Sequence, residues 1–93
     1  MRITFDPAKR EATLQARGLD FADALQVFED TTYDVVDDRR DYGEARVISI
    51  GFLDEWMVVV VWTQRGDARH VISMRKCNER EQIRYLPFVS PGR

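Results

Sequence analysis

Apolar residues recur at helical spacing in the first third of the chain. Asp6 is a suitable N-cap, Pro7 is a favoured first helical residue, and Gly18 is placed to end the helix. The sequence therefore predicts a helix over residues 7–17. Asp20 caps a second helix, in which apolar residues follow at positions i, i+3, i+4 and i+7. That spacing predicts one apolar stripe that packs against a sheet.

A third helix is expected near the end of the chain. Asn78, with Glu81 three residues later, forms an Asx variant of the capping box that starts a helix to about Leu86. Pro87 ends this helix because it has no backbone N–H to donate. The tail, residues 88–93, is expected to be frayed.

Between these helices the apolar positions alternate, as they do in strands. Four strands are expected, at residues 32–36, 45–52, 55 or 56 to 64, and 68–75. The third is apolar on both faces, which predicts a central strand, whereas residues 37–44 are charged and turn-prone and predict a solvated loop.

The connections between these strands are short, and short connections make neighbouring strands antiparallel. We therefore expect an α+β fold with two N-terminal helices, a four-stranded antiparallel sheet and a C-terminal helix. The helices should cover one face of the sheet. The other face would then be available for a ligand, a partner or a second copy of the chain.

Length and composition indicate one domain, residues 1–93, because 93 residues with 44% apolar content can form one core. Cys77 is the only cysteine and has no internal disulfide partner, and no apolar stretch follows Met1. We therefore expect a cytoplasmic protein. The longest apolar run, residues 56–62, is far shorter than a membrane-spanning helix, so no membrane partner is expected.

Charge is divided unevenly along the chain. Residues 1–60 contain seven Lys or Arg and thirteen Asp or Glu, whereas residues 61–93 contain seven and three. The Arg-rich end suits phosphate and nucleic acid, because guanidinium groups offer planar, permanently charged donors. The net charge is −2 and the pI about 5.3, so we expect any contact with RNA to be local.

RNA cleavage without a metal requires a base, cations that stabilise the charge on the phosphate, and an acid for the leaving oxygen. Arg75 and Lys76 lie where the last strand meets the last helix, and this junction is the leading candidate site. Arg80 and Arg84 share one face of that helix. The alternative for these two arginines is an ordinary solvated face.

His70 is the only histidine, and its ordinary pKa suits proton transfer near neutrality. Simple alternation groups it with Ile72 and Met74, and if that face is the core, His70 is a strand-end residue with a hydrogen-bonded ring. Cys77 is expected to be a small packed residue rather than a nucleophile. The sequence has neither metal-ligand spacing nor a glycine-rich phosphate loop, so we expect no metal and no cofactor.

Several motifs also occur together in a characteristic order: FDPAK (5–9), Gly18, FADALQVFED (21–30), GEARVISIG (43–51), RGD (65–67), and VISMRK (71–76) followed by Glu79 or Glu81 and by Tyr85. Over about residues 5–85 the chain resembles the BrnT family of type II toxins. The resemblance implies a RelE-like fold and metal-independent RNA cleavage that inhibits translation. It also implies neutralisation by a cognate, BrnA-like, DNA-binding antitoxin. The two proteins would form a hetero-oligomer, and the chain would contact operator DNA only through the antitoxin.

The resemblance implies roles for five residues. Glu44 and Arg46 stand where the family has Glu-x-Arg, and His70 stands where many members have Arg. Arg75 matches the arginine of the family's Ile-Ser-Ala-Arg, and Tyr85 matches its closing tyrosine. The arginines and His70 would hold the phosphate, while Glu44, His70 or Tyr85 would move protons. The expected RNA-binding residues are Arg69, Lys76, Arg80 and Arg84.

Two departures from the family pattern support an alternative function. Thr13 stands where Asn is usual, and Arg17 stands where His precedes the glycine. The alternative is an RNase-like binding module, catalytically weak or inactive, that acts through its antitoxin complex in promoter repression. A third hypothesis is an unrelated small regulatory domain.

Overall fold

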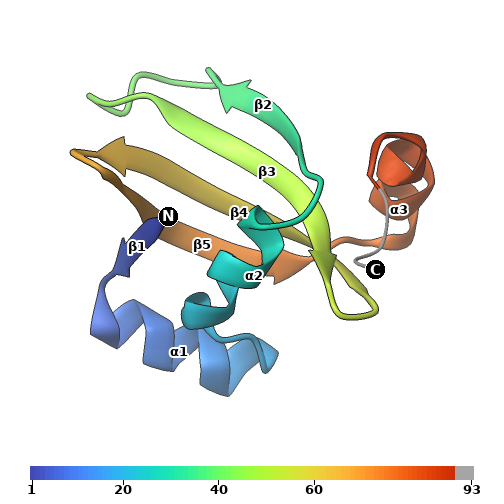
Figure 1. Cartoon of the computed structure of the whole chain (residues 1–93), viewed down its shortest axis with the longest axis horizontal. Helices are drawn as coiled ribbons and strands as arrows, with labels where there is room; N and C mark the ends of the chain where they lie inside the picture. The colour runs from blue at the N-terminus through green and yellow to red at the C-terminus, as the bar shows by residue number, and fades with distance from the viewer. Residues whose placement is uncertain (90–93) are drawn as a thin grey trace.

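The computed structural model describes residues 1–89 and shows one five-stranded sheet with helices on both sides (Figure 1). The elements are, in chain order, β1 (Arg2–Phe5), α1 (Pro7–Arg17), η1 (Phe21–Asp23, a 3₁₀ helix), α2 (Ala24–Phe28), β2 (Tyr33–Asp37), β3 (Arg46–Leu53), β4 (Trp56–Arg65), β5 (Ala68–Lys76), α3 (Glu79–Tyr85) and η2 (Leu86–Phe88, a 3₁₀ helix). The predicted α+β class is confirmed. In the described part of the chain, no helix is both long and apolar enough to cross a membrane.

The strand order is β1-β5-β4-β3-β2, so β4 is central, as its apolar faces predicted. Strands β2 to β5 pair antiparallel, but β1 pairs parallel with β5, with Arg2 opposite Ala68 and Phe5 opposite Val71. The expected four-stranded antiparallel sheet is therefore wrong. Four residues are too few to show alternation, and their partner strand lies near the other end of the chain.

One face of the sheet, the covered face, packs against η1 and α2, and α1 contacts η1 and β5 (Figure 1). The predicted bounds of the first helix are confirmed. The Asp6 carboxylate accepts the Ala8 N–H at 2.8 Å, and Gly18 adopts the left-handed conformation that ends the helix. The second helix is not continuous: a 3₁₀ turn precedes a short α-helix, and both bury side chains in the core.

The other face, the open face, is covered at one end by α3 and the residues that follow it. Tyr85 and Val89 pack with apolar side chains of β3 and β4, and Phe88 stacks on Tyr33 with ring centroids 4.7 Å apart. The expectation that all helices cover one face is therefore wrong, as is the frayed tail for Phe88 and Val89. Residues 90–93 of that tail lie outside the described residues.

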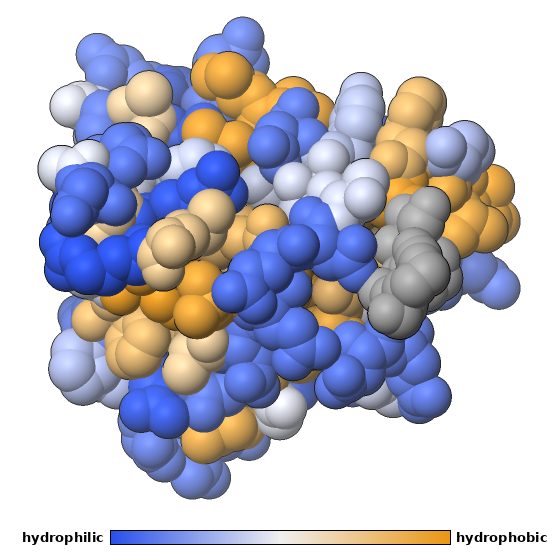
Figure 2. Space-filling model, viewed as in Figure 1, coloured by the Kyte–Doolittle hydropathy of each residue, from blue (hydrophilic) through white to orange (hydrophobic). Residues whose placement is uncertain are grey.

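The outer side of α3 and η2 remains apolar at the molecular surface (Figure 2). Ile83, Leu86 and Phe88 are the exposed apolar side chains there.

A β-bulge at Ile72 decides which face His70 occupies. Val61 pairs with Ser73 and Trp62 pairs with Val71, so Ile72 has no partner in the ladder. Because Val71 and Trp62 belong to the covered-face core, His70 and its partner lie on the open face. The grouping of His70 with Met74 is therefore wrong, since Met74 belongs to the covered-face core and strict alternation fails at a bulge.

Candidate functional site

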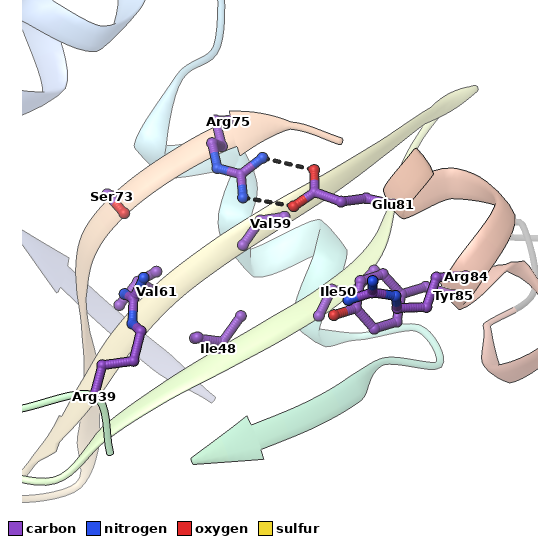
Figure 3. Close-up of a pocket in the computed structure, with 10 residues that line it drawn as sticks. All are labelled: Arg39, Ile48, Ile50, Val59, Val61, Ser73, Arg75, Glu81, Arg84 and Tyr85. Carbon is purple, nitrogen blue, oxygen red and sulfur yellow. Dashed lines mark hydrogen bonds and ion pairs between the residues drawn. The ribbon is translucent and has the colours of Figure 1, made fainter. Parts of the chain in front are cut away.

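A groove of about 480 Å³ crosses the open face between β5, α3 and the loop that follows β2 (Figure 3). Its floor is aliphatic and comes from β3 and β4: Ile48, Ile50, Val59 and Val61. Its polar lining comes from the surrounding elements: Arg39, Ser73, Arg75, Glu81, Arg84 and Tyr85. Three arginines around an apolar floor make the groove suitable for an anionic ligand with a flat apolar part.

Arg75, near the end of β5, is held by Glu81 of α3 (Figure 3). Two hydrogen bonds of 2.8 Å join its terminal Nη1 and Nη2 atoms to the two carboxylate oxygens. Glu81 also accepts the Asn78 N–H at 2.9 Å, and Asn78 accepts the Glu81 N–H in return. The predicted capping box is therefore confirmed, and it fixes the carboxylate that orients Arg75.

The charges of this pair stabilise each other. The hydrogen bond from Arg75 lowers the pKa of Glu81 to about 2, and the same bond raises the pKa of Arg75. Both groups are therefore ionised at neutral pH, and the carboxylate has no proton to donate there.

Arg84 and Tyr85 reach the groove from the last turn of α3. The Arg84 guanidinium lies 5.9 Å from the centre of the Tyr85 ring, which in turn lies 5.6 Å from the ring of Tyr33 on β2. The contact between Tyr85 and Tyr33 positions the end of α3 over the open face.

Arg39 lines the groove on the side opposite β5, and sequence reasoning missed it. Its Nε and Nη2 donate to the two oxygens of Asp37, each at 2.8 Å, and Tyr42 donates to the same carboxylate at 3.2 Å. Asp37 is buried, with 1% of its side chain exposed, whereas 73% of the Arg39 side chain is exposed. The available signal was the acid directly after a predicted strand, two residues before an arginine.

Glu44, Arg46 and His70 do not line the groove. They lie on the open face at the end of the sheet opposite α3, where Arg46 begins β3. Glu44 is 3.7 Å from Arg46 and 3.5 Å from Arg65, so its charge is shared between two guanidinium groups. The Arg46 guanidinium stacks 4.0 Å from the centre of the Tyr42 ring.

His70 is hydrogen-bonded to β1. Its Nδ1 lies 2.8 Å from the Thr4 hydroxyl, the residue opposite it in the parallel ladder. Burial lowers the pKa of His70, and the nearby positive charge of Arg65 lowers it further. The neutral imidazole is therefore favoured at neutral pH, so the ring does not supply the permanent charge of an arginine.

The remaining basic candidates fall on different surfaces. Arg80 is exposed on α3, outside the lining of the groove. Arg69 lies on the covered face, 4.1 Å from the Trp62 ring centre, and Lys76 lies 3.9 Å from that of Trp56. Of the four expected RNA-binding residues, only Arg84 lines the groove, and the RNA contacts of all four stay predictions.

Cys77 is packed, as expected. It is buried, and desolvation raises the pKa of its thiol to about 11, so the thiol is protonated at neutral pH. Among residues 1–89, no three His, Cys, Asp or Glu side chains are grouped so that they could hold a metal ion.

A family of known proteins matches most of the chain. The sequence model of a family described as "Ribonuclease toxin, BrnT, of type II toxin-antitoxin system" matches residues 5–81. No curated protein matches the chain. The matched segment contains Arg39, Arg75 and Glu81, whereas Arg84 and Tyr85 lie beyond it.

Proposed function

The chain belongs to the BrnT family of ribonuclease toxins of type II toxin–antitoxin systems, and we propose that it is an endoribonuclease that cleaves RNA without a metal and so inhibits translation. The observation that carries this proposal is Arg75, fixed by a bidentate carboxylate at an arginine-lined groove. A preorganised guanidinium of this kind stabilises the charge that develops on a phosphate under attack.

In this reaction the 2′-oxygen of the RNA attacks the neighbouring phosphorus and the bond to the 5′-oxygen breaks. Arg75 and Arg84 hold the phosphate and stabilise its added charge. A water molecule takes the proton of the 2′-hydroxyl. Tyr85 is the groove residue that we assign as the acid that protonates the departing 5′-oxygen, because Glu81 is held as a carboxylate and has no proton to donate. Arg46 and His70 contact the RNA farther along the open face.

We further propose that residues 1–93 act as one RelE-like domain in the cytoplasm. The type II family implies an antitoxin partner. We propose that this partner is a BrnA-like, DNA-binding protein, that it neutralises the chain in a hetero-oligomer, and that operator DNA is contacted only through it.

The test is expression of the chain alone in a bacterial host, beside Arg75→Ala and, as a matched control, Arg40→Ala, an exposed arginine outside the groove. The wild type and Arg40→Ala should slow growth and shorten cellular RNA, and Arg75→Ala should lose on the order of 10²–10³ in cleavage rate. Purified wild type should cleave RNA in the presence of EDTA. Growth and RNA length equal to an empty control, at equal protein level, would contradict the proposal.

A second candidate is a binding module with little or no cleavage activity. It is favoured by one observation: Glu44, Arg46 and His70 lie outside the groove that holds Arg75 and Tyr85. On this proposal the purified chain leaves RNA intact but still forms the antitoxin complex that represses the promoter. An electrophoretic shift of operator DNA by that complex, with no cleavage by the free chain, would support it.

A further inference from the structure

Two arginines face the groove from opposite sides, and each is held by a carboxylate (Figure 3). Arg75 comes from β5 and pairs with Glu81, whereas Arg39 comes from the loop after β2 and pairs with Asp37. The aliphatic floor separates them.

Each arginine keeps donors free after this pairing. A guanidinium has five N–H donors in a planar fork, and a bidentate carboxylate uses two of them. Arg75 meets Glu81 through Nη1 and Nη2, which leaves its Nε side available. Arg39 meets Asp37 through Nε and Nη2, which leaves its Nη1 side available. Both residues can therefore bind a phosphate without releasing the carboxylate that holds them.

Asp37 is well placed to orient Arg39. It ends β2, opposite Arg46 of β3, so its backbone is fixed by the sheet. Its buried carboxylate also accepts the Arg39 backbone N–H at 3.3 Å and the Tyr42 hydroxyl. A mobile, exposed arginine loses much side-chain entropy on binding a ligand, and holding it in place beforehand reduces that loss.

We propose that Arg39 is a second phosphate-binding residue of the groove and that Asp37 is its positioning residue. An unpaired RNA strand then crosses the open face with one phosphate at Arg75, another at Arg39, and the nucleoside between them on the aliphatic floor. An unpaired strand is required because a base inside a duplex cannot reach that floor. This inference rests on the proposed function and specifies its substrate.

The test measures the binding of a short single-stranded RNA whose 2′-hydroxyls are methylated, so that it cannot be cleaved. Fluorescence anisotropy at several salt concentrations gives Kd and its salt dependence. Arg39→Ala should raise Kd about tenfold, because a charge-assisted pair is lost. It should also reduce the slope of log K against log salt by about 0.7, the value for one phosphate contact on a single strand.

Arg40→Ala is the matched control. Arg40 is the next residue, is exposed, lies over the Tyr42 ring at 5.3 Å and does not line the groove. It should leave Kd and slope unchanged. Equal effects of the two substitutions, or no effect of Arg39→Ala, would overturn the proposal. Arg39→Lys should keep the salt dependence of binding but bind RNA more weakly than wild type, because lysine retains the positive charge and lacks the planar donors of the guanidinium.

The role of Asp37 is tested by a double-mutant cycle. Asp37→Asn should weaken RNA binding in the wild type but have no further effect in the Arg39→Ala background, because it acts through Arg39. A melting curve for each variant reports folding separately. An equal loss of affinity in both backgrounds would make Asp37 structural and remove its positioning role.

Failure of this inference can be distinguished from failure of the proposed function. If wild type cleaves ordinary RNA but Arg39→Ala binds and cleaves like wild type, the inference fails and the ribonuclease proposal stands. If no cleavage occurs but the Arg39 effects on binding are present, the ribonuclease proposal fails and the groove remains an RNA-binding site. If the wild type binds a duplex of the same length with equal affinity, the requirement for an unpaired RNA strand is wrong.

Discussion

Glu81 serves two parts of the molecule at once. Its carboxylate accepts the Asn78 N–H at the start of α3 and both terminal nitrogens of Arg75. Its pKa is lowered from 4.5 to about 2, so the ionised form contributes stability above about pH 4.5, and that contribution is lost as pH falls through about 2. The orientation of Arg75 is therefore insensitive to pH in the neutral range.

His70, unlike Glu81, makes the stability of the fold depend on pH close to neutrality. Its pKa is lowered in the folded state, so below its ordinary value of 6.5 the unfolded chain binds more protons than the folded chain. We predict that the melting temperature of wild type falls as pH drops below about 6.5. The melting temperature of His70→Gln, which keeps a hydrogen-bonding partner for Thr4, should fall less steeply with pH. The same dependence of melting temperature on pH in the two proteins between pH 5 and 8 would contradict this prediction.

Catalytic assistance by His70 has its own pH signature. If the charged ring holds RNA, cleavage per folded molecule should rise only below pH 6.5, because the lowered pKa delays protonation. His70→Arg should then flatten the pH profile of cleavage. An unchanged profile with a lowered melting temperature would remove His70 from the site.

The helix α3 has little burial to support it. It has seven residues, none of them fully buried, and an isolated helix of that length is not stable in water. The capping box, the Arg75 pair and the packing of Tyr85 hold it against the open face. Two groove residues, Arg84 and Tyr85, therefore depend on the cap at the other end of their helix.

We predict that Asn78→Ala costs about 1 kcal/mol of unfolding free energy, the usual value of an N-cap. For a domain of this size that lowers the melting temperature by roughly 4–8 °C. The same change should weaken RNA binding, because Arg84 and Tyr85 lose their fixed position. Asn78→Ser keeps a capping oxygen and should restore both properties. Destabilisation without any change in RNA affinity would show that the groove does not depend on the cap.

For the whole molecule, charge rather than shape limits nucleic-acid binding. The net charge is −2, and the acidic first sixty residues contribute the strand β2 and the loop that carry Asp37 and Arg39. Repulsion from this surface opposes nonspecific contact with a polyanion, so binding depends on the arginines gathered at the groove.

We predict that the isolated chain binds duplex DNA weakly at about 0.15 M salt and that operator binding requires the antitoxin. Fluorescence anisotropy with labelled operator DNA, with and without the antitoxin, measures this. A sub-micromolar Kd for the chain alone would contradict the charge argument.

The sequence by itself determined the features that depend on neighbouring residues. Caps and spacing gave the bounds of α1 and the start of α3, alternation located β2 to β5, and the doubly apolar run identified β4 as central. Each of these depends on local backbone geometry or on periodicity within one element. Arg75 could be selected from the sequence for the same reason, because it lies where a strand meets a capped helix.

Tertiary structure alone decided which surfaces these elements present. The parallel pairing of β1, the docking of α3 on the open face and the bulge at Ile72 all depend on contacts between distant segments. The bulge moved His70 to the open face, and the fold placed Arg39 at the groove while leaving Glu44, Arg46 and His70 outside it. A local pattern records which residues are near in sequence, whereas a site depends on which ones the packed sheet brings together.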